Sequence, residues 1–167
     1  IMSSDWSSDV CSSDLGALAL MGREMTVAEI AGEVLADLAF YRRSGGGVTI
    51  SGGESLMQRD FVLDLVARCR AAGVHTAIES NMAWPWAHVE PVVRGVDLVM
   101  MDIKLIDDAA HRRWTGVSNR HVLANAHRLA GEDADVIVRT PVVCGVNDDV
   151  EQIAAIAGHV ADLPNLL

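Results

Sequence analysis

Apolar residues recur along this chain with two alternating periods, which predicts a regular succession of helices and strands. The first helical pattern holds Val27, Ile30, Val34, Leu38 and Tyr41 on one face. Thr26 and Glu29 stand before it in the positions of a capping box. Further helices are predicted over about residues 59–72 and 86–94, after Asn119, and from Asn147 or Asp148 onward.

Short runs of β-branched and apolar residues separate these helices and predict four strands. The predicted strands are Val48–Ser51, His75–Ser80, Leu98–Lys104 and Val136–Val143. Such alternation is typical of the α/β class, with a parallel sheet and right-handed crossovers. It fits either an open sheet or part of a (β/α) barrel. Another strand is due at Leu166 and Leu167, so we expect a partial fold that lacks its N- and C-terminal parts.

The first fifteen residues differ from the rest. The tripeptide Ser-Ser-Asp occurs at residues 3–5, 7–9 and 12–14, without apolar periodicity or the pattern of a signal peptide. We interpret residues 1–15 as non-native sequence, with a disordered low-complexity tail as the alternative. Residues 16–167 then form one partial domain, and Cys11 has no function under either interpretation.

Composition excludes several classes of protein. The 167 residues suit one domain, and the net charge of −10 argues against binding to nucleic acid or to anionic lipid. The apolar runs are too short to span a bilayer. The cysteines Cys11, Cys69 and Cys144 lack any metal-binding spacing, which favours a reducing, cytoplasmic location and predicts no metal site.

Polar residues follow each predicted strand near its carboxyl end, where active sites of parallel α/β folds form. They are Gly52, Gly53 and Glu54, then Glu79 and Asn81, then Asp102 and Lys104, and finally Arg139. The glycines let a ligand approach the backbone, because no Cβ stands in the way. Carboxylates with Lys and Arg suit a zwitterionic, amino-acid-like ligand. The alternatives are a structural ion pair, a solvated Glu79, and an Arg139 that only neutralises carboxylates.

Six motifs in order resemble those of the enzymes that activate glycyl-radical enzymes. They are Gly46–Glu54, Gly73–Asn81, Met101–Lys104, Thr115–Asn119, Val138–Pro141 and Gly145–Asp148. These activating enzymes are radical S-adenosylmethionine (SAM) proteins related to the activase of pyruvate formate-lyase. The resemblance implies a partial (β/α)₆ barrel that holds SAM and a [4Fe–4S] cluster. A 5′-deoxyadenosyl radical would take a hydrogen from a glycine of a partner in the pyruvate formate-lyase superfamily, with flavodoxin or ferredoxin as electron donor.

The resemblance also implies roles for the residues at the strand ends. The backbone at Gly52, Gly53 and Glu54 would meet the methionine ammonium group. Glu79 and Asp102 would line the same pocket with a monovalent cation, and Asn81 lies beside them. Lys104, together with Arg139, would hold the carboxylate.

The chain departs from the family pattern at several positions. The C-x-x-x-C-x-x-C cluster motif is absent, Ser55 and Cys144 replace prolines, and Glu79 stands where Asp is common. We therefore predict that this chain binds no cluster, has no identifiable catalytic residue and is inactive alone.

Two other functions stay open. Asp102, Lys104 and Asp107 have the D-x-K-x-x-D spacing of an orotidine-type decarboxylase. The chain could also be a non-catalytic barrel fragment.

Overall fold

The computed structural model describes residues 23–167, and its sheet confirms the predicted parallel α/β class. The four strands are β1 (Gly47–Ile50), β2 (His75–Ser80), β3 (Leu98–Asp102) and β4 (Asp135–Arg139). They pair in parallel in the order β1-β2-β3-β4, and this sheet is open. The predictions for residues 1–15 and for Cys11 lie outside the described residues.

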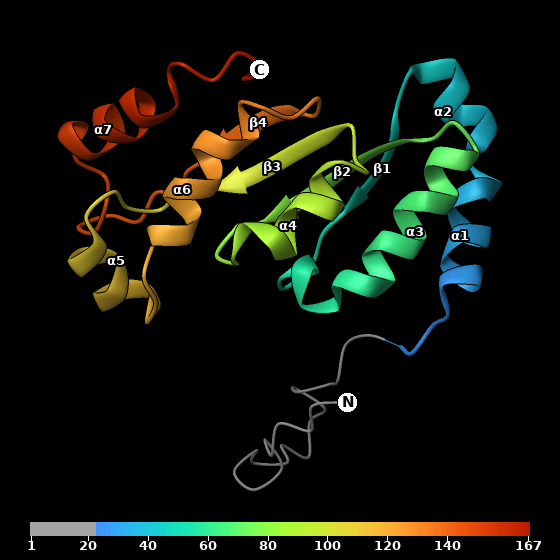
Figure 1. Cartoon of the computed structure of the whole chain (residues 1–167), viewed down its shortest axis with the longest axis horizontal. Coiled ribbons are helices and arrows are strands. Elements are labelled where there is room, and N and C mark those ends of the chain that lie inside the picture. The colour runs from blue at the N-terminus through green and yellow to red at the C-terminus, as the bar shows by residue number, and fades with distance from the viewer. Residues whose placement is uncertain (1–22) are drawn as a thin grey trace, which may run out of the picture.

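Helices connect the strands and cover the sheet. They are α1 (Val27–Ala36), α2 (Leu38–Ser44), the 3₁₀ turn η1 (Ser55–Gln58), α3 (Arg59–Ala71), α4 (Trp86–Val93), α5 (Asp108–Thr115), α6 (Arg120–Leu129) and α7 (Val150–Val160). Strands paired in chain order through right-handed crossovers place successive helices on one face. Figure 1 shows α4 and α6 lying over the strands. Within residues 23–167, no helix is long and apolar enough to cross a membrane.

The first predicted helix forms in two pieces. Its capping box is present: the Thr26 N–H donates to Glu29 Oε2 at 2.7 Å, and the Glu29 N–H donates to Thr26 Oγ1 at 3.2 Å. The apolar pattern predicted one continuous helix through Leu38. This was wrong, because Asp37 leaves helical geometry and separates α1 from α2. Asp has low helix propensity because its side chain competes for backbone hydrogen bonds. The apolar residues of α1 and α2 nevertheless pack together against Leu65 and Cys69 of α3.

Helix α5 was missing from the helices predicted from apolar periodicity, because most of its eight residues are polar. Asp107 begins it by accepting the Ala110 N–H at 2.7 Å, and Gly116, at φ +81°, ends it. Two of the predicted strands also extended too far at their carboxyl ends. Strand β3 ends at Asp102 and β4 at Arg139, so the residues that follow them belong to loops.

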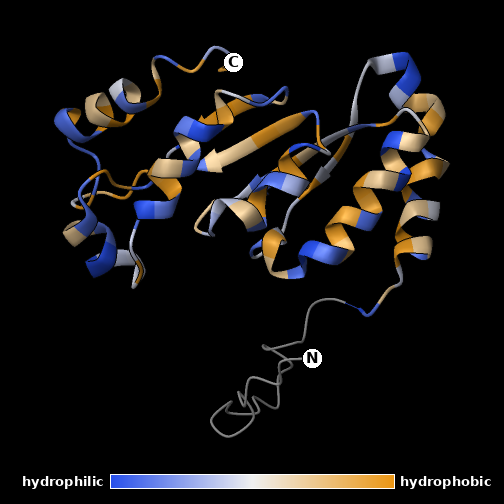
Figure 2. Cartoon of the chain, in the orientation of Figure 1, coloured by the Kyte–Doolittle hydropathy of each residue, from blue (hydrophilic) through white to orange (hydrophobic). Residues whose placement is uncertain are grey.

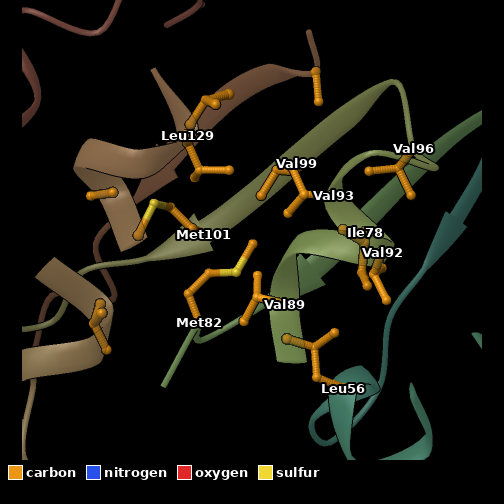
Figure 3. Packing of buried hydrophobic residues seen from close by; sticks show 14 of the residues in the cluster. Leu56, Ile78, Met82, Val89, Val92, Val93, Val96, Val99, Met101 and Leu129 are labelled. Atoms are coloured by element: carbon orange, nitrogen blue, oxygen red, sulfur yellow. The ribbon is translucent and has the colours of Figure 1, made fainter. Parts of the chain in front are cut away.

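The two faces of the sheet differ in character. Ile78, Val99, Met101 and Val136 are buried against the helices, where they join the main hydrophobic core. Figure 3 labels the first three. Strand β3 is apolar along nearly all its length in Figure 2. Side chains alternate along a strand, so the neighbours of these residues point to the opposite face. That face is where Glu79, Asp102 and Arg139 are only partly buried.

The last residues run beside the outer edge of β4. The Val136 N–H donates to Asn165 O at 2.8 Å, and the Leu167 N–H donates to Val136 O at 2.9 Å. Leu166 thereby forms a parallel bridge with Val136. This pairing lies where the sequence predicted that another strand was due.

Candidate functional site

A polar cavity of about 200 Å³ lies at the carboxyl edge of the sheet. Its lining consists of Gly52, Gly53, Glu54, Glu79, Ser80, Asn81, Asp102, Lys104 and Arg139. All eight residues predicted from the strand ends therefore lie together, and only Ser80 was not anticipated. Parallel strands end at the same edge of a sheet, which brings residues far apart in the chain into one pocket.

Strand register explains which side chains meet. Asp102 stands directly opposite Arg139 in the β3–β4 pair, so both side chains lie on the open face. Glu79 of β2 belongs to the same face, one strand further away. The long Arg139 side chain reaches across β3 to join these two carboxylates.

Ion pairs link the charged groups into a chain. Arg139 donates from Nη1 to Glu79 Oε1 at 2.6 Å and from Nη2 to Asp102 Oδ1 at 3.2 Å. Lys104 Nζ lies 3.2 Å from Asp102 Oδ2. Glu79 is therefore paired with Arg139 and is not simply solvated. Asp102 and Lys104 form the ion pair that the first alternative described, and Arg139 contacts both carboxylates as the third described. Lys104 is also the only lysine of the chain.

Hydrogen bonding lowers the pKa of the Glu79 carboxyl. The main cause is Ser51, whose Oγ donates to Glu79 Oε2 at 2.7 Å, and Arg139 is the second cause. The same contact with Glu79 raises the pKa of Arg139. Sequence reasoning missed Ser51, because only the pairing of β1 with β2 places it beside Glu79.

The carboxylate of Glu54 is hydrogen-bonded to neighbouring groups of the protein. It accepts hydrogen bonds from Ser80 Oγ at 2.7 Å, from the Asn81 N–H at 2.9 Å and from the Leu56 N–H at 3.2 Å. The ion pairs of the described residues do not include Glu54. The Asn81 side chain is likewise engaged, since its Oδ1 accepts the Ala83 N–H at 2.9 Å.

The backbone beside Glu54 is open. A Cβ added at Gly52 or Gly53 would meet no heavy atom within 4 Å, and Gly52, at φ +117°, adopts a conformation that favours glycine. A ligand can therefore approach these peptide groups. Backbone carbonyls suit a cation such as an ammonium group, while Lys104 and Arg139 suit an anion.

The structure explains the places of Ser55 and Asp107. Ser55, in place of a proline, is buried and donates from Oγ to Glu79 O at 3.2 Å, which links η1 to β2. Asp107 lies outside the cavity lining and caps α5. The decarboxylase interpretation required Asp107 beside Asp102 and Lys104, and this geometry does not favour it.

The described residues do not fit an iron–sulfur cluster. Cys69 is buried and Cys144 is exposed. Over residues 23–167, no group of three His, Cys, Asp or Glu side chains could hold a metal ion. A larger cavity of about 730 Å³ lies between α1, β1 and α3, but its lining is mostly apolar or uncharged. We take the smaller cavity as the candidate site, because it lies at the carboxyl ends of the parallel strands and gathers charged side chains there.

Comparison with known proteins identifies the family. The model of the radical SAM superfamily matches residues 16–157. The chain belongs to this superfamily. Its members use SAM and a [4Fe–4S] cluster.

Relatives of this chain include activating enzymes. The chain is 42% identical over 144 residues to the (2S)-3-sulfopropanediol dehydratase activating enzyme of Klebsiella oxytoca, covering 86% of this chain and 45% of the relative. It is 42% identical over 149 residues to the isethionate sulfite-lyase activating enzyme of Oleidesulfovibrio alaskensis, covering 88% and 48%. The chain spans about half the length of these relatives.

Solved structures agree with this radical SAM assignment. A domain of the pyruvate-formate lyase-activating enzyme from Bacteroides vulgatus is 34% identical, with a TM-score of 0.65 over 72% of this chain and 75% of that one. A radical SAM methyltransferase from Sphaerobacter thermophilus is 16% identical, with a TM-score of 0.65 over 87% of this chain and 47% of that one. The second similarity shows the fold alone.

Proposed function

We propose that this chain carries the SAM-binding wall of an enzyme that activates a glycyl-radical enzyme of the pyruvate formate-lyase superfamily. The observation that carries the proposal is the convergence of eight predicted residues, from four strands, on one cavity. The named activities of the relatives support the kind of partner.

The charges of the cavity match the methionine part of SAM. Lys104 and Arg139 face the carboxylate, and the open backbone at Gly52, Gly53 and Glu54 accepts the ammonium group. Glu79 and Asp102 hold the two cations in place through the ion pairs described above. A monovalent cation binds to the same two carboxylates in this pocket. In an enzyme that activates a glycyl-radical enzyme, SAM would accept one electron from the [4Fe–4S] cluster and be cleaved to methionine and a 5′-deoxyadenosyl radical, which would take a hydrogen atom from a glycine of the partner.

The cluster and the electron transfer belong to a longer parent protein. Cys69 and Cys144 offer no cluster site, so we propose that this chain alone binds no [4Fe–4S] cluster and is inactive. The parent would act in the cytoplasm and receive electrons from flavodoxin or ferredoxin. It would contact neither nucleic acid nor a membrane.

Chemical labelling of Lys104 tests the SAM site directly. As the only lysine, it offers acetic anhydride a single side-chain amine, apart from the amino terminus. We expect saturating SAM to slow acetylation of Lys104 by about tenfold, because a bound carboxylate would cover Nζ. Peptide mass spectrometry measures the rate, and the amino terminus serves as internal control. Equal rates with and without SAM would refute the site.

Anaerobic reconstitution with iron and sulfide tests the second part of the proposal. We expect no stable cluster, measured as protein-bound iron and sulfide and as charge-transfer absorbance after desalting. The control is a radical SAM enzyme of full length, treated in the same way. A stable [4Fe–4S] spectrum of this chain would contradict the proposal, because the chain could then hold the cluster that catalysis needs.

A further inference from the structure

Buried asparagines support the loops that carry the site. Asn119, Asn125 and Asn147 are only 2%, 0% and 2% exposed. Burying an amide is costly unless its polar atoms are hydrogen-bonded. Each of these side chains donates from Nδ2 to two backbone carbonyls in loops beyond the strand ends. None of the three was predicted to do this.

Asn125 of α6 supports the loop after β2. Its Nδ2 donates to Met82 O at 2.9 Å and to Trp84 O at 2.8 Å. Met82 has φ +52°, the one positive φ among the non-glycine residues described. This conformation is costly for a residue with a side chain. Figure 3 shows the Met82 side chain in the core near Val89 and Met101, so the loop is held from both sides.

The same loop holds Glu54 in the site. The Met82 N–H donates to Ser80 Oγ at 3.0 Å, and Ser80 Oγ donates to Glu54 Oε1 at 2.7 Å. The Asn81 N–H donates to Glu54 Oε2 at 2.9 Å. A shift of Met82 would therefore move two of the three donors that orient Glu54, and with them the open backbone of the glycine pair.

Asn147 supports the loops after β3 and β4. Its Nδ2 donates to Lys104 O at 2.8 Å and to Pro141 O at 3.0 Å, while its Oδ1 accepts the Val143 N–H at 2.7 Å. It thus holds the backbone of Lys104 against the loop that follows Arg139. Asn119 supports the next part of the β3 loop, through Leu105 O at 2.9 Å and Ile106 O at 2.7 Å.

We propose that Asn125 and Asn147 are positioning residues for the ligand site. Asn125 sets the place of Glu54 and the glycine pair, and Asn147 sets the place of Lys104. The part of this inference that concerns SAM rests on the proposed function. The part that concerns the loops does not, because hydrogen exchange measures it without any ligand.

Asn165 provides a matched control. Its Nδ2 donates to Leu129 O at 2.9 Å, Glu132 O at 3.3 Å and Ala134 O at 2.6 Å. These carbonyls precede β4, at the opposite edge of the sheet from the cavity. Asn165→Asp therefore removes the same kind of amide contact without touching the loops of the site.

The test compares Asn125→Asp, Asn147→Asp and Asn165→Asp in the full chain. Aspartate has nearly the shape of asparagine but no N–H donors, so the carbonyls lose their partners. Hydrogen exchange followed by mass spectrometry should show protection falling by about tenfold in residues 80–84 for N125D and in residues 103–106 for N147D. N165D should leave the protection of both segments within about twofold of that in the unsubstituted chain.

SAM affinity, measured by calorimetry, gives the second readout. We expect it to fall by about tenfold in N125D and N147D and to stay within about twofold in N165D, at matched thermal stability. If N125D does not fold, Asn125→Ser takes its place. Unchanged exchange in the two loops, or an equal loss of affinity in N165D, would overturn the inference. If the unsubstituted chain binds no SAM, the proposed function fails. The exchange data still decide whether the asparagines hold the loops.

Discussion

Replacing Gly47 by alanine is expected to lower the free energy of unfolding by about 3 kcal/mol. A Cβ at this position would lie 1.9 Å from His75 O and 2.6 Å from His75 C. Gly47 is paired with His75 at the start of the β1–β2 ladder, so the obstacle is backbone and not a side chain that could rotate. The two strands would have to separate, which would also pull Ser51 away from Glu79.

Thermal unfolding measures this effect, and we expect the midpoint to fall by about 10 °C. Gly32→Ala in α1 is the matched control, because a Cβ there meets no heavy atom within 4 Å. In a helix interior, this change should stabilise the protein by about 0.5–1 kcal/mol. Equal midpoints for the two variants would show that β1 and β2 do not pair as described.

Replacing Arg139 by methionine is expected to weaken SAM binding by about 10- to 100-fold. Arg139 joins Glu79 to Asp102, so its loss leaves Glu79 without its cation, while Asp102 keeps Lys104, and removes one cation for the ligand carboxylate. The effect on stability should be smaller, about 1 kcal/mol, because the side chain is 38% exposed and solvent screens its ion pairs. Calorimetry and thermal unfolding separate the two effects.

Arg139→Met should also change the response to acid. The pKa of Glu79 is lowered in the folded state, so its contribution to stability is present above pH 4.5 and is lost as the pH falls through the folded-state pKa. Without Arg139, its hydrogen bond and its positive charge no longer lower this pKa, so the pKa of Glu79 rises. The acid-induced loss of stability should therefore become smaller.

Arg94→Met is the control for both measurements. Arg94 also bridges two carboxylates, Glu90 at 2.7 Å and Glu132 at 3.1 Å, but on the surface away from the cavity. Its replacement should leave SAM affinity and the titration of Glu79 unchanged. A similar loss of SAM affinity in both variants would mean that Arg139 acts through stability and not through the site.

Much of the site could be predicted because parallel strands obey a simple rule. Each strand delivers its carboxyl end to one edge of the sheet, so polar residues after four successive strands must converge. Glu54, Glu79, Asp102 and Arg139 follow this rule and line one cavity. Asp107 shows where spacing fails, since a position five residues after Asp102 can equally begin a helix, and here it caps α5.

Other features depend on contacts between distant segments. Asn119 and Asn147 stand beside predicted helix starts, and the sequence assigned them to those starts. Asn119 is the N-cap residue of α6, as predicted, but its side chain makes no capping hydrogen bond. The structure buries both amides against loop carbonyls, while Asp149 caps α7 by accepting the Gln152 N–H at 2.7 Å. A side chain that can satisfy either a helix end or a loop gives no local sign of which it will choose.

The sequence by itself determined the order of the four strands, the alternation of strands with helices, the parallel sheet, and the set of residues at its carboxyl edge. These follow from local periodicity and from the geometry of crossover connections, which need no knowledge of distant contacts. Only the tertiary structure decided that Arg139 joins Glu79 to Asp102, that Ser51 lowers the pKa of Glu79, and that Asn125 holds the strained Met82. Those interactions depend on strand register and on burial, and both arise only when the separate segments pack together.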